Sequence, residues 1–293
     1  MRIASRPLDR LALVGAAALL GGWLALPIVA AATESRAPAE QSVVALTLGA
    51  GEHTLLKAFP HALYRSSNKG RDWQSVAIPA AVERGRIAAI AAHGGGVIYL
   101  AGAGFGVLRS VDAGRNWVAK NDGLPSDAVA AVSMHTTQRN TVYAYVVGHG
   151  IYRSEDSGGH WRLMDAGPRE SIRQLVHSNM PGSMQTGWLF AATAKGVARS
   201  MDCFCGWRDA GALGHATNAV AYDPAQPKRV YAAAEDTLLV SVDGGEHWGK
   251  LQSPIRAATA LAVSPKGLLY AASDDGNVFR SADHGLTWRS SDA

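Results

Sequence analysis

The sequence predicts an all-β fold, a six-bladed β-propeller with four-stranded antiparallel blades. The first observation is an eight-residue motif, Ser-x-Asp-x-Gly-x-x-Trp, found in six copies whose starting serines lie 40 to 46 residues apart. A fixed period of this length, filled by short strand-like segments, is typical of propeller blades. Helical periodicity is weak throughout, and 32 glycines in 293 residues suit many short strands joined by turns.

Each copy of the motif predicts a strand, a tight turn and a second strand. Short Ser and Asp side chains bond nearby backbone amides, and glycine adopts the positive φ that other residues resist. The tryptophan ring can cover the turn and pack on the neighbouring sheet. We interpret the motif as structural, because one active site does not need copies around a whole ring. Its positions are Ser66, Asn68, Gly70 and Trp73; Ser110, Asp112, Gly114 and Trp117; Ser154, Asp156, Gly158 and Trp161; Ser200, Asp202 and Trp207; Ser241, Asp243, Gly245 and Trp248; and Ser281, Asp283, Gly285 and Trp288.

The segments between the motifs follow one order in every repeat. An apolar first segment precedes a second segment rich in β-branched and aromatic residues, as expected for strands. The first segments are 43–48, 87–92, 129–134, 172–176, 219–222 and 260–263. The chain ends soon after the last motif, so we expect a short final outer strand and a ring closed by side-chain packing. The predicted propeller is 43–293.

The N-terminal residues predict export. Residues 11–32 contain no charged side chain and follow three arginines, so 1–32 is a signal peptide or a membrane anchor. In both cases the positive charge stays on the cytoplasmic side. The remainder is expected in the periplasm or outside the cell, with residues 11–32 as its sole membrane contact if they are retained. The polar residues 33–42 are read as a linker.

The net charge and the cysteine content bear on which ligands the protein could bind and on the state of its thiols. The formal net charge is +4, too small to favour a nucleic-acid partner. No cofactor is expected. Cys203 and Cys205 are the two cysteines of the chain. In an oxidising compartment they could form a local disulfide, remain free thiols or bind a soft metal, and the sequence leaves these open.

The motif resembles the Asp-box, or BNR, repeat of bacterial sialidases, sortilin-type receptors, xyloglucan hydrolases and the photosystem II assembly and stability factor family. The resemblance covers roughly residues 43 to 291. The sequence NDGLP between repeats and Tyr-Arg-Ser or Phe-Arg-Ser before the motifs are most similar to the last of these groups. The resemblance implies the propeller fold but leaves function open, because these families include enzymes, receptors and assembly factors.

Two copies depart from the motif. The first has Asn68 in place of the aspartate, which keeps a turn-forming side chain without the charge. The fourth has Phe204 in place of the glycine, with a cysteine on each side. We therefore expect the fourth turn to differ from the others.

A glycosidase is the leading enzymatic hypothesis. The sialidase resemblance would require three arginines for a carboxylate, a tyrosine nucleophile and an acidic residue. The arginines before the motif serines and the tyrosines of the second segments recur with the repeat. The remaining candidates are Arg84, Arg86, Arg169, Arg173, Arg208 and Arg256, with Tyr145 and Tyr222.

Three histidines share one position of the repeat, just past the first segment: His93, His135 and His177. Three imidazoles near the axis would suit Zn²⁺ or Cu²⁺. Asp223 and Ser264 hold the same position in the next two repeats. The alternative is therefore a turn position at which His, Asp and Ser all cap a chain reversal.

The sequence as a whole favours an exported, non-enzymatic scaffold that binds a protein or a glycan through its inter-blade connectors. A rigid ring that presents variable loops suits such a role. A sialidase-like glycoside hydrolase is the alternative, and a periplasmic metal-binding protein is a second one.

Overall fold

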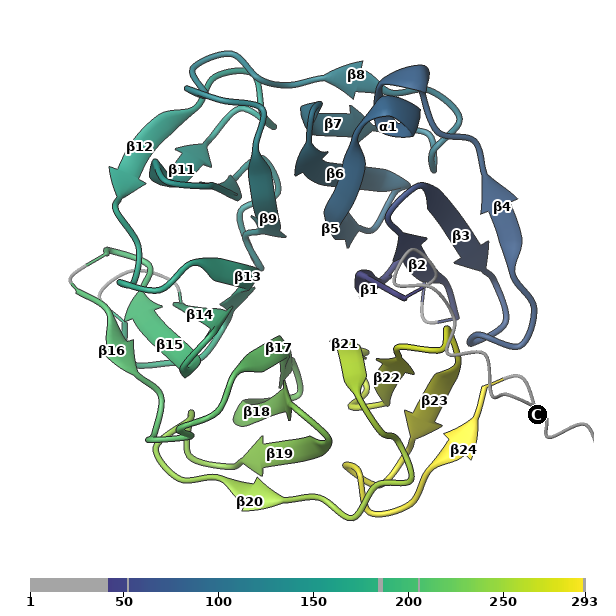
Figure 1. Cartoon of the computed structure of the whole chain (residues 1–293), viewed down its shortest axis with the longest axis vertical. Coiled ribbons are helices and arrows are strands. Elements are labelled where there is room, and N and C mark those ends of the chain that lie inside the picture. The colour runs from purple at the N-terminus through teal and green to yellow at the C-terminus, as the bar shows by residue number, and fades with distance from the viewer. Residues whose placement is uncertain (1–41, 52, 184–186, 205, 292–293) are drawn as a thin grey trace, which may run out of the picture. The chain divides into compact units, whose positions relative to one another are not determined.

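The computed structural model describes residues 42–291, apart from 52, 184–186 and 205. The predicted signal peptide or anchor, and all of the linker but its last residue, lie outside the described residues. Six four-stranded antiparallel sheets stand around a central axis (Figure 1), which confirms the six-bladed propeller. Within the described part of the chain, no helix is long and apolar enough to cross a membrane.

The blades contain 24 strands in the described residues. The innermost strands are β1 (Ala45–Leu48), β5 (Arg86–His93), β9 (Val129–Met134), β13 (Ile172–Ser178), β17 (Thr217–Asp223) and β21 (Ala258–Val263). The second strands are β2 (Leu55–Phe59), β6 (Val97–Ala103), β10 (Val142–Val146), β14 (Trp188–Thr193), β18 (Gln226–Ala234) and β22 (Leu269–Ser273). The third strands are β3 (Ala62–Ser66), β7 (Gly106–Ser110), β11 (Gly150–Ser154), β15 (Gly196–Met201), β19 (Thr237–Ser241) and β23 (Val278–Ser281). The outer strands are β4 (Gln74–Val76), β8 (Val118–Ala119), β12 (Arg162–Asp165), β16 (Arg208–Asp209), β20 (Gly249–Lys250) and β24 (Arg289–Ser290).

Each sheet consists of four strands that are consecutive in the chain, so the first and last blades each complete themselves. β1 lies beside β21 (Figure 1). The two blades share a buried apolar cluster that includes Leu55 and Tyr270. Lys57 Nζ also donates to the carbonyl of Gly276 at 3.0 Å. The ring therefore closes by packing together with at least one side-chain hydrogen bond, and not by packing alone.

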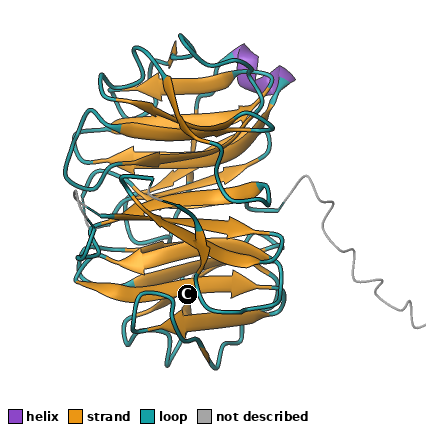
Figure 2. Ribbon diagram, turned by 90° about the vertical axis from the view of Figure 1, so that its left-hand side faces the viewer, coloured by secondary structure: helices purple, strands orange, loops and turns teal. Residues whose placement is uncertain are grey.

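The two faces of the ring differ in what they carry, and Figure 2 shows the strands running between them. We call the side where the inner strands begin, and where the second and third strands are joined, the connector face. The opposite side carries the turns that follow the third strands, and we call it the motif face. A short helix, α1 (Ala80–Arg84), lies in the connector between the first two blades and buries Val82. The sequence pattern did not predict this helix.

The motif turn is held by its own side chains. In the second copy, Ser110 Oγ donates to Asp112 Oδ1 at 2.8 Å and accepts the N–H of Gly114 at 2.8 Å. The same two bonds occur in the first, third, fifth and sixth copies. Ala113 (φ 60°) and Gly114 (φ 89°) are both left-handed, so the turn needs two such residues in succession. In all six copies the outer strand begins one residue after the tryptophan.

In four copies the motif tryptophan also bonds a residue of the preceding blade. Trp161 Nε1 donates to the carbonyl of Lys120 at 2.8 Å, and Trp248 Nε1 donates to that of Ala210 at 2.7 Å. A Cβ added to Gly114 would lie 2.5 Å from Val76 Cγ1 of the first blade. Repetition of these contacts explains why most tryptophans of the chain serve the repeat.

Candidate functional site

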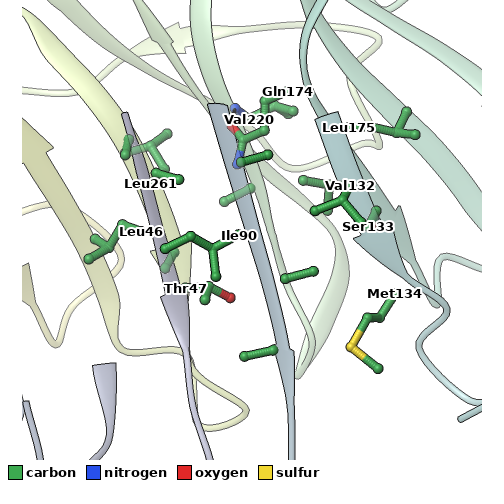
Figure 3. Close-up of a pocket in the computed structure, with 18 of the residues that line it drawn as sticks. Leu46, Thr47, Ile90, Val132, Ser133, Met134, Gln174, Leu175, Val220 and Leu261 are labelled. Carbon is green, nitrogen blue, oxygen red and sulfur yellow. Dashed lines mark hydrogen bonds between the residues drawn. The ribbon is translucent and has the colours of Figure 1, made fainter. Parts of the chain in front are cut away.

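The six inner strands enclose a channel of about 360 Å³. Its wall is largely aliphatic, because each inner strand turns small or branched side chains toward the axis. Figure 3 shows Leu46, Ile90 and Leu261 on this wall together with the polar Gln174. Gln174 Oε1 accepts the backbone N–H of Val220 at 2.8 Å, so this polar group joins two blades.

The connector-face mouth of the channel carries a polar relay across three blades. Arg173 Nη1 donates to Asn218 Oδ1 at 3.0 Å, and Asn218 Nδ2 donates to the carbonyl of Ala258 at 3.3 Å. Arg173 is exposed and lines the channel. A guanidinium has five N–H donors. The bond to Asn218 fixes one end of the group and uses one of these donors.

The channel does not gather the groups of a glycosidase. Among the described residues, its lining contains no Asp or Glu and includes Arg173 as its one arginine. Tyr222, a candidate nucleophile from the sequence, lines the channel, but burial raises the pKa of its hydroxyl. A neutral phenol with a raised pKa is a poor nucleophile. The carboxylate pair or arginine trio that hydrolysis would need is therefore not assembled in this channel.

A second polar feature lies between the third and fourth blades, where His135, His177 and Asp202 come together. Asp202 Oδ2 lies 3.7 Å from His177 Nε2 and 3.9 Å from His135 Nε2. The two imidazoles stack with their centroids 3.9 Å apart. All three residues are buried. The structure thus unites two of the three predicted histidines with a carboxylate of the fourth motif.

His93, the third predicted histidine, is half-buried at the end of β5 and lines the channel, but it is not part of this group. In its blade, Asp112 remains bonded to Ser110 within its own turn. The nearest equivalent of Asp202 is therefore not directed toward His93.

The histidine rings use their Nδ1 atoms as acceptors. His135 Nδ1 accepts the N–H groups of Thr137 at 3.1 Å and Gln138 at 3.0 Å. His177 Nδ1 accepts the N–H of Thr136 at 3.3 Å. A ring nitrogen that accepts an N–H carries no proton, so each neutral imidazole is protonated on Nε2. Two Nε2–H groups then face one carboxylate, and neither presents the lone pair that a metal ion requires.

The acceptor role of His135 matches that of other residues at the same position of the repeat. Asp223 Oδ1 accepts the N–H of Ala225 at 2.9 Å, and Ser264 Oγ accepts that of Leu268 at 3.0 Å. All three side chains cap a reversal of the chain. This observation supports the turn-capping interpretation over the metal hypothesis.

The environment keeps both rings neutral. Burial lowers the pKa of His177 to about 4, and the neighbouring His135 ring adds to the effect. Burial also lowers the pKa of His135, while the negative charge of Asp202 opposes that change. Near neutral pH both imidazoles of the cluster are therefore uncharged.

The altered fourth motif places Asp202 in this cluster. β15 continues one residue past Ser200, so that Met201 pairs with Trp188, and the Asp202 N–H donates to the carbonyl of Gly187 at 3.1 Å. Ser200 Oγ donates to the Met201 carbonyl instead of a carboxylate. Phe204 then takes the positive φ, at 55°. The predicted difference of this turn is thus a longer hairpin that directs Asp202 inward.

The carboxylates of the regular motifs accept hydrogen bonds from groups of their own turns. The N–H and side-chain amide of Asn116, together with Ser110, lower the pKa of Asp112 to about 2. The side chain and N–H of Thr287 likewise lower the pKa of Asp283 to about 2. Such hydrogen-bonded, permanently ionised groups are turn anchors and poor general acids.

Cys203 lies in the fourth motif turn, next to Asp202. The other cysteine of the chain, Cys205, lies outside the described residues, so their pairing stays a prediction.

Comparisons with known proteins establish the fold of the chain but not its family. No protein-family description and no curated protein matches the sequence. Among solved structures, a GH74 enzyme of Niastella koreensis is similar with a TM-score of 0.60 and 17% identity, covering 85% of this chain and 47% of that one. This chain therefore spans about half the length of that enzyme.

Two further structures are similar over most of both chains. YCF48 bound to D1 peptide has a TM-score of 0.58 and 18% identity, with 86% of this chain and 83% of that one covered. A chain of the nidogen/laminin complex has a TM-score of 0.61 and 12% identity, with 78% and 88% covered. At these identities the similarity establishes a β-propeller and no more.

Proposed function

We propose that this chain is an exported, non-enzymatic propeller of the Asp-box type that binds a segment of a partner protein on its connector face. The observation that carries the proposal is the relay from Arg173 through Asn218 to Ala258 at the mouth of the channel. It holds a guanidinium in place on a rigid ring, with donors left for carbonyl or carboxylate groups of a ligand. Preorganisation of this kind reduces the entropy lost on binding.

The comparisons support a protein ligand over a sugar substrate. YCF48, which is bound to a peptide in its structure, has nearly the length of this chain. The GH74 enzyme is about twice as long, so this chain corresponds to only half of it. The channel lining adds support, since its described residues include no carboxylate for glycoside hydrolysis. A glycan ligand bound without hydrolysis is the competing outcome of the test below.

The two faces offer matched positions for a crosslinking test. Val147 is 46% exposed in the hairpin that joins β10 to β11, on the connector face, and Val242 is 64% exposed in the fifth motif turn, on the opposite face. A photo-crosslinking amino acid would replace each valine in turn, in full-length protein expressed in its native cells. Adducts would be identified by mass spectrometry.

The proposal predicts a defined protein adduct from position 147 that is lost when Arg173→Ala is added, with no such adduct from position 242. Equal adducts from both positions, or an adduct unchanged by Arg173→Ala, would overturn it. Release of sugars from a polysaccharide panel by the purified protein would favour the hydrolase instead.

A further inference from the structure

A cationic groove lies at the seam where the last blade meets the first. It has a volume of about 330 Å³ and is lined by Lys69, Leu268, Arg280, Ala282, Thr287 and Arg289. Three of these six side chains are cationic and none is anionic. We refer to it as the seam groove.

The seam groove forms only when the ring closes. Lys69 belongs to the first motif turn, whereas Arg280 and Arg289 lie on β23 and β24 of the last blade. Arg280 and Arg289 are directly paired between these two strands, so their side chains leave the same face of the sheet. Segments about two hundred residues apart therefore supply one site.

Two other blades contain the same arginine pair and provide an internal comparison. Arg153 pairs with Arg162 between β11 and β12, and Arg199 pairs with Arg208 between β15 and β16. In each case a glutamate meets the third-strand arginine. Glu155 lies 2.9 Å from Arg153, and Glu246 of the next blade forms an ion pair with Arg199.

The repeat shows what the seam groove has in place of that glutamate. Arg199 also donates to the carbonyl of Gly244 at 2.6 Å, and Gly244 and Glu246 stand three and five residues after their motif serine. The residues at the same two positions of the first motif are Lys69, which lines the groove with Arg280, and Arg71. The glutamate position of the one seam is thus an arginine in the first motif, while the Gly244 contact is made by a backbone carbonyl, which any residue at that position supplies.

The three cations of the seam groove form no direct ion pair with a described residue, although the ionised Asp283 is bonded to the lining residue Thr287. None of the ion pairs formed by residues 42–291, with the gaps given above, involves Lys69, Arg280 or Arg289. The hydroxyl of Thr287 is already committed to Asp283, at 2.6 Å. A groove lined by charges of one sign concentrates the field and attracts a counter-ion.

We propose that the seam groove binds a phosphate or sulfate group. Guanidinium groups match tetrahedral oxyanions with paired N–H donors, and the ammonium adds a point charge. Three cations suit an ion of about two negative charges better than a single carboxylate. The bound group would join the first and last blades at the closing seam of the ring. This site is separate from the connector-face site and does not depend on the proposed function.

The test is titration calorimetry of the full chain with inorganic phosphate, inorganic sulfate and acetate at constant ionic strength. Wild type is expected to bind phosphate or sulfate with one site and acetate at least tenfold more weakly. Arg289→Gln and Leu268→Glu should each weaken binding of the dianions at least tenfold, whereas Arg162→Gln, the matched change in the third blade, should leave it unchanged. A phosphoserine tripeptide and a sulfated monosaccharide, added as separate arms, would show which source is preferred.

Two outcomes would overturn the proposal. The first is binding of equal strength in wild type, Arg289→Gln and Leu268→Glu. The second is binding seen only after Asp292→Asn, which would assign the cations to a carboxylate of the chain itself. Circular dichroism of each variant confirms that the propeller is intact, and Arg289 is exposed, so its replacement is not expected to unfold the chain.

Discussion

Asp202 Oδ2 lies 3.7 Å from His177 Nε2, although the corresponding aspartates of the second, third, fifth and sixth motifs stay bonded to the serine of their own turn. A related contact occurs between the fifth and sixth blades, where His284 Nδ1 lies 3.7 Å from Asp223 Oδ2. In that pair the inner-strand position supplies the acid and the motif supplies the imidazole. The contact between Asp202 of the fourth blade and His135 of the third, 3.9 Å apart, has the same arrangement across neighbouring blades with the two positions exchanged.

The first prediction concerns the contribution of Asp202 to stability. Asp202→Ala removes the negative charge that faces two buried Nε2–H donors and leaves a cavity, so it should lower the free energy of unfolding by about 1–3 kcal/mol. Urea denaturation measures this change. Asp122→Ala serves as the control, since Asp122 is 78% exposed and pairs with the surface residue His160. A loss no larger for Asp202→Ala than for Asp122→Ala would contradict the assigned role.

The second prediction is a loss of stability in mild acid. The pKa of His177 is about 4 in the folded chain, below its ordinary value of 6.5, and that of His135 is lowered too. Between these values the unfolded chain binds protons that the folded chain does not, so the free energy of unfolding falls as the pH drops from about 6.5 towards 4. Urea midpoints at pH 7.5, 5.5 and 4.5 measure the slope. The dependence of the urea midpoint on pH should be weaker in the double variant His135→Gln/His177→Gln. The motif carboxylates Asp112 and Asp283 do not contribute in this range, because their pKa values are lower, near 2. An unchanged dependence on pH would count against the assignment.

The third prediction separates the cluster from a metal centre. Both Nδ1 atoms accept backbone N–H groups. Zn²⁺ at Nε2 would therefore require a deprotonated ring or a broken turn. Calorimetry with Zn²⁺ and Cu²⁺ should give the same result for wild type and for a triple alanine variant of His93, His135 and His177. Stoichiometric uptake by wild type that disappears in the variant would restore the metal hypothesis.

The fourth prediction tests the contact between blades made by the motif. Gly114→Ala places a Cβ 2.5 Å from Val76 Cγ1 at a φ of 89°, and should cost about 2–4 kcal/mol from strain and overpacking together. Gly148→Ala is the matched control, because Gly148 also has a positive φ, 75°, but has no atom within 4 Å of the added Cβ. Thermal or urea unfolding should show the larger loss for Gly114→Ala. Equal losses would mean that backbone strain alone matters at these turns.

The fold could be predicted because the motif chemistry is local. The side chains of Ser110 and Asp112 form the turn with groups only a few residues away. The same sequence of strands and turn recurs every 40 to 46 residues, which is the length of one blade. The mode of ring closure could not be predicted, because it depends on contacts between the first and last blades, such as the bond from Lys57 to the Gly276 carbonyl. Helix α1 was missed because five residues carry too little periodicity to be recognised.

The candidate sites could be predicted only in part. Repeat alignment identified His135 and His177 as equivalent positions. It could not show that Nε2 carries the proton in both rings and so has no free lone pair for a metal ion. It also could not show that Asp202 joins them, since this depends on one additional residue in β15. Phe204 in place of glycine was the available signal. Arg173 was among the arginines left after the repeat was subtracted, while its link to Asn218 required the geometry of two adjacent blades.

The most direct measurement of the central claim is the affinity of a peptide ligand for wild type and for Arg173→Ala. Peptides would be selected from a random display library against the purified propeller, and the strongest would be measured by calorimetry. We predict at least a tenfold loss of affinity in Arg173→Ala and no loss in Arg162→Ala, an exposed arginine on an outer strand. Affinity that is the same for all three proteins would contradict a binding site at the connector-face mouth of the channel.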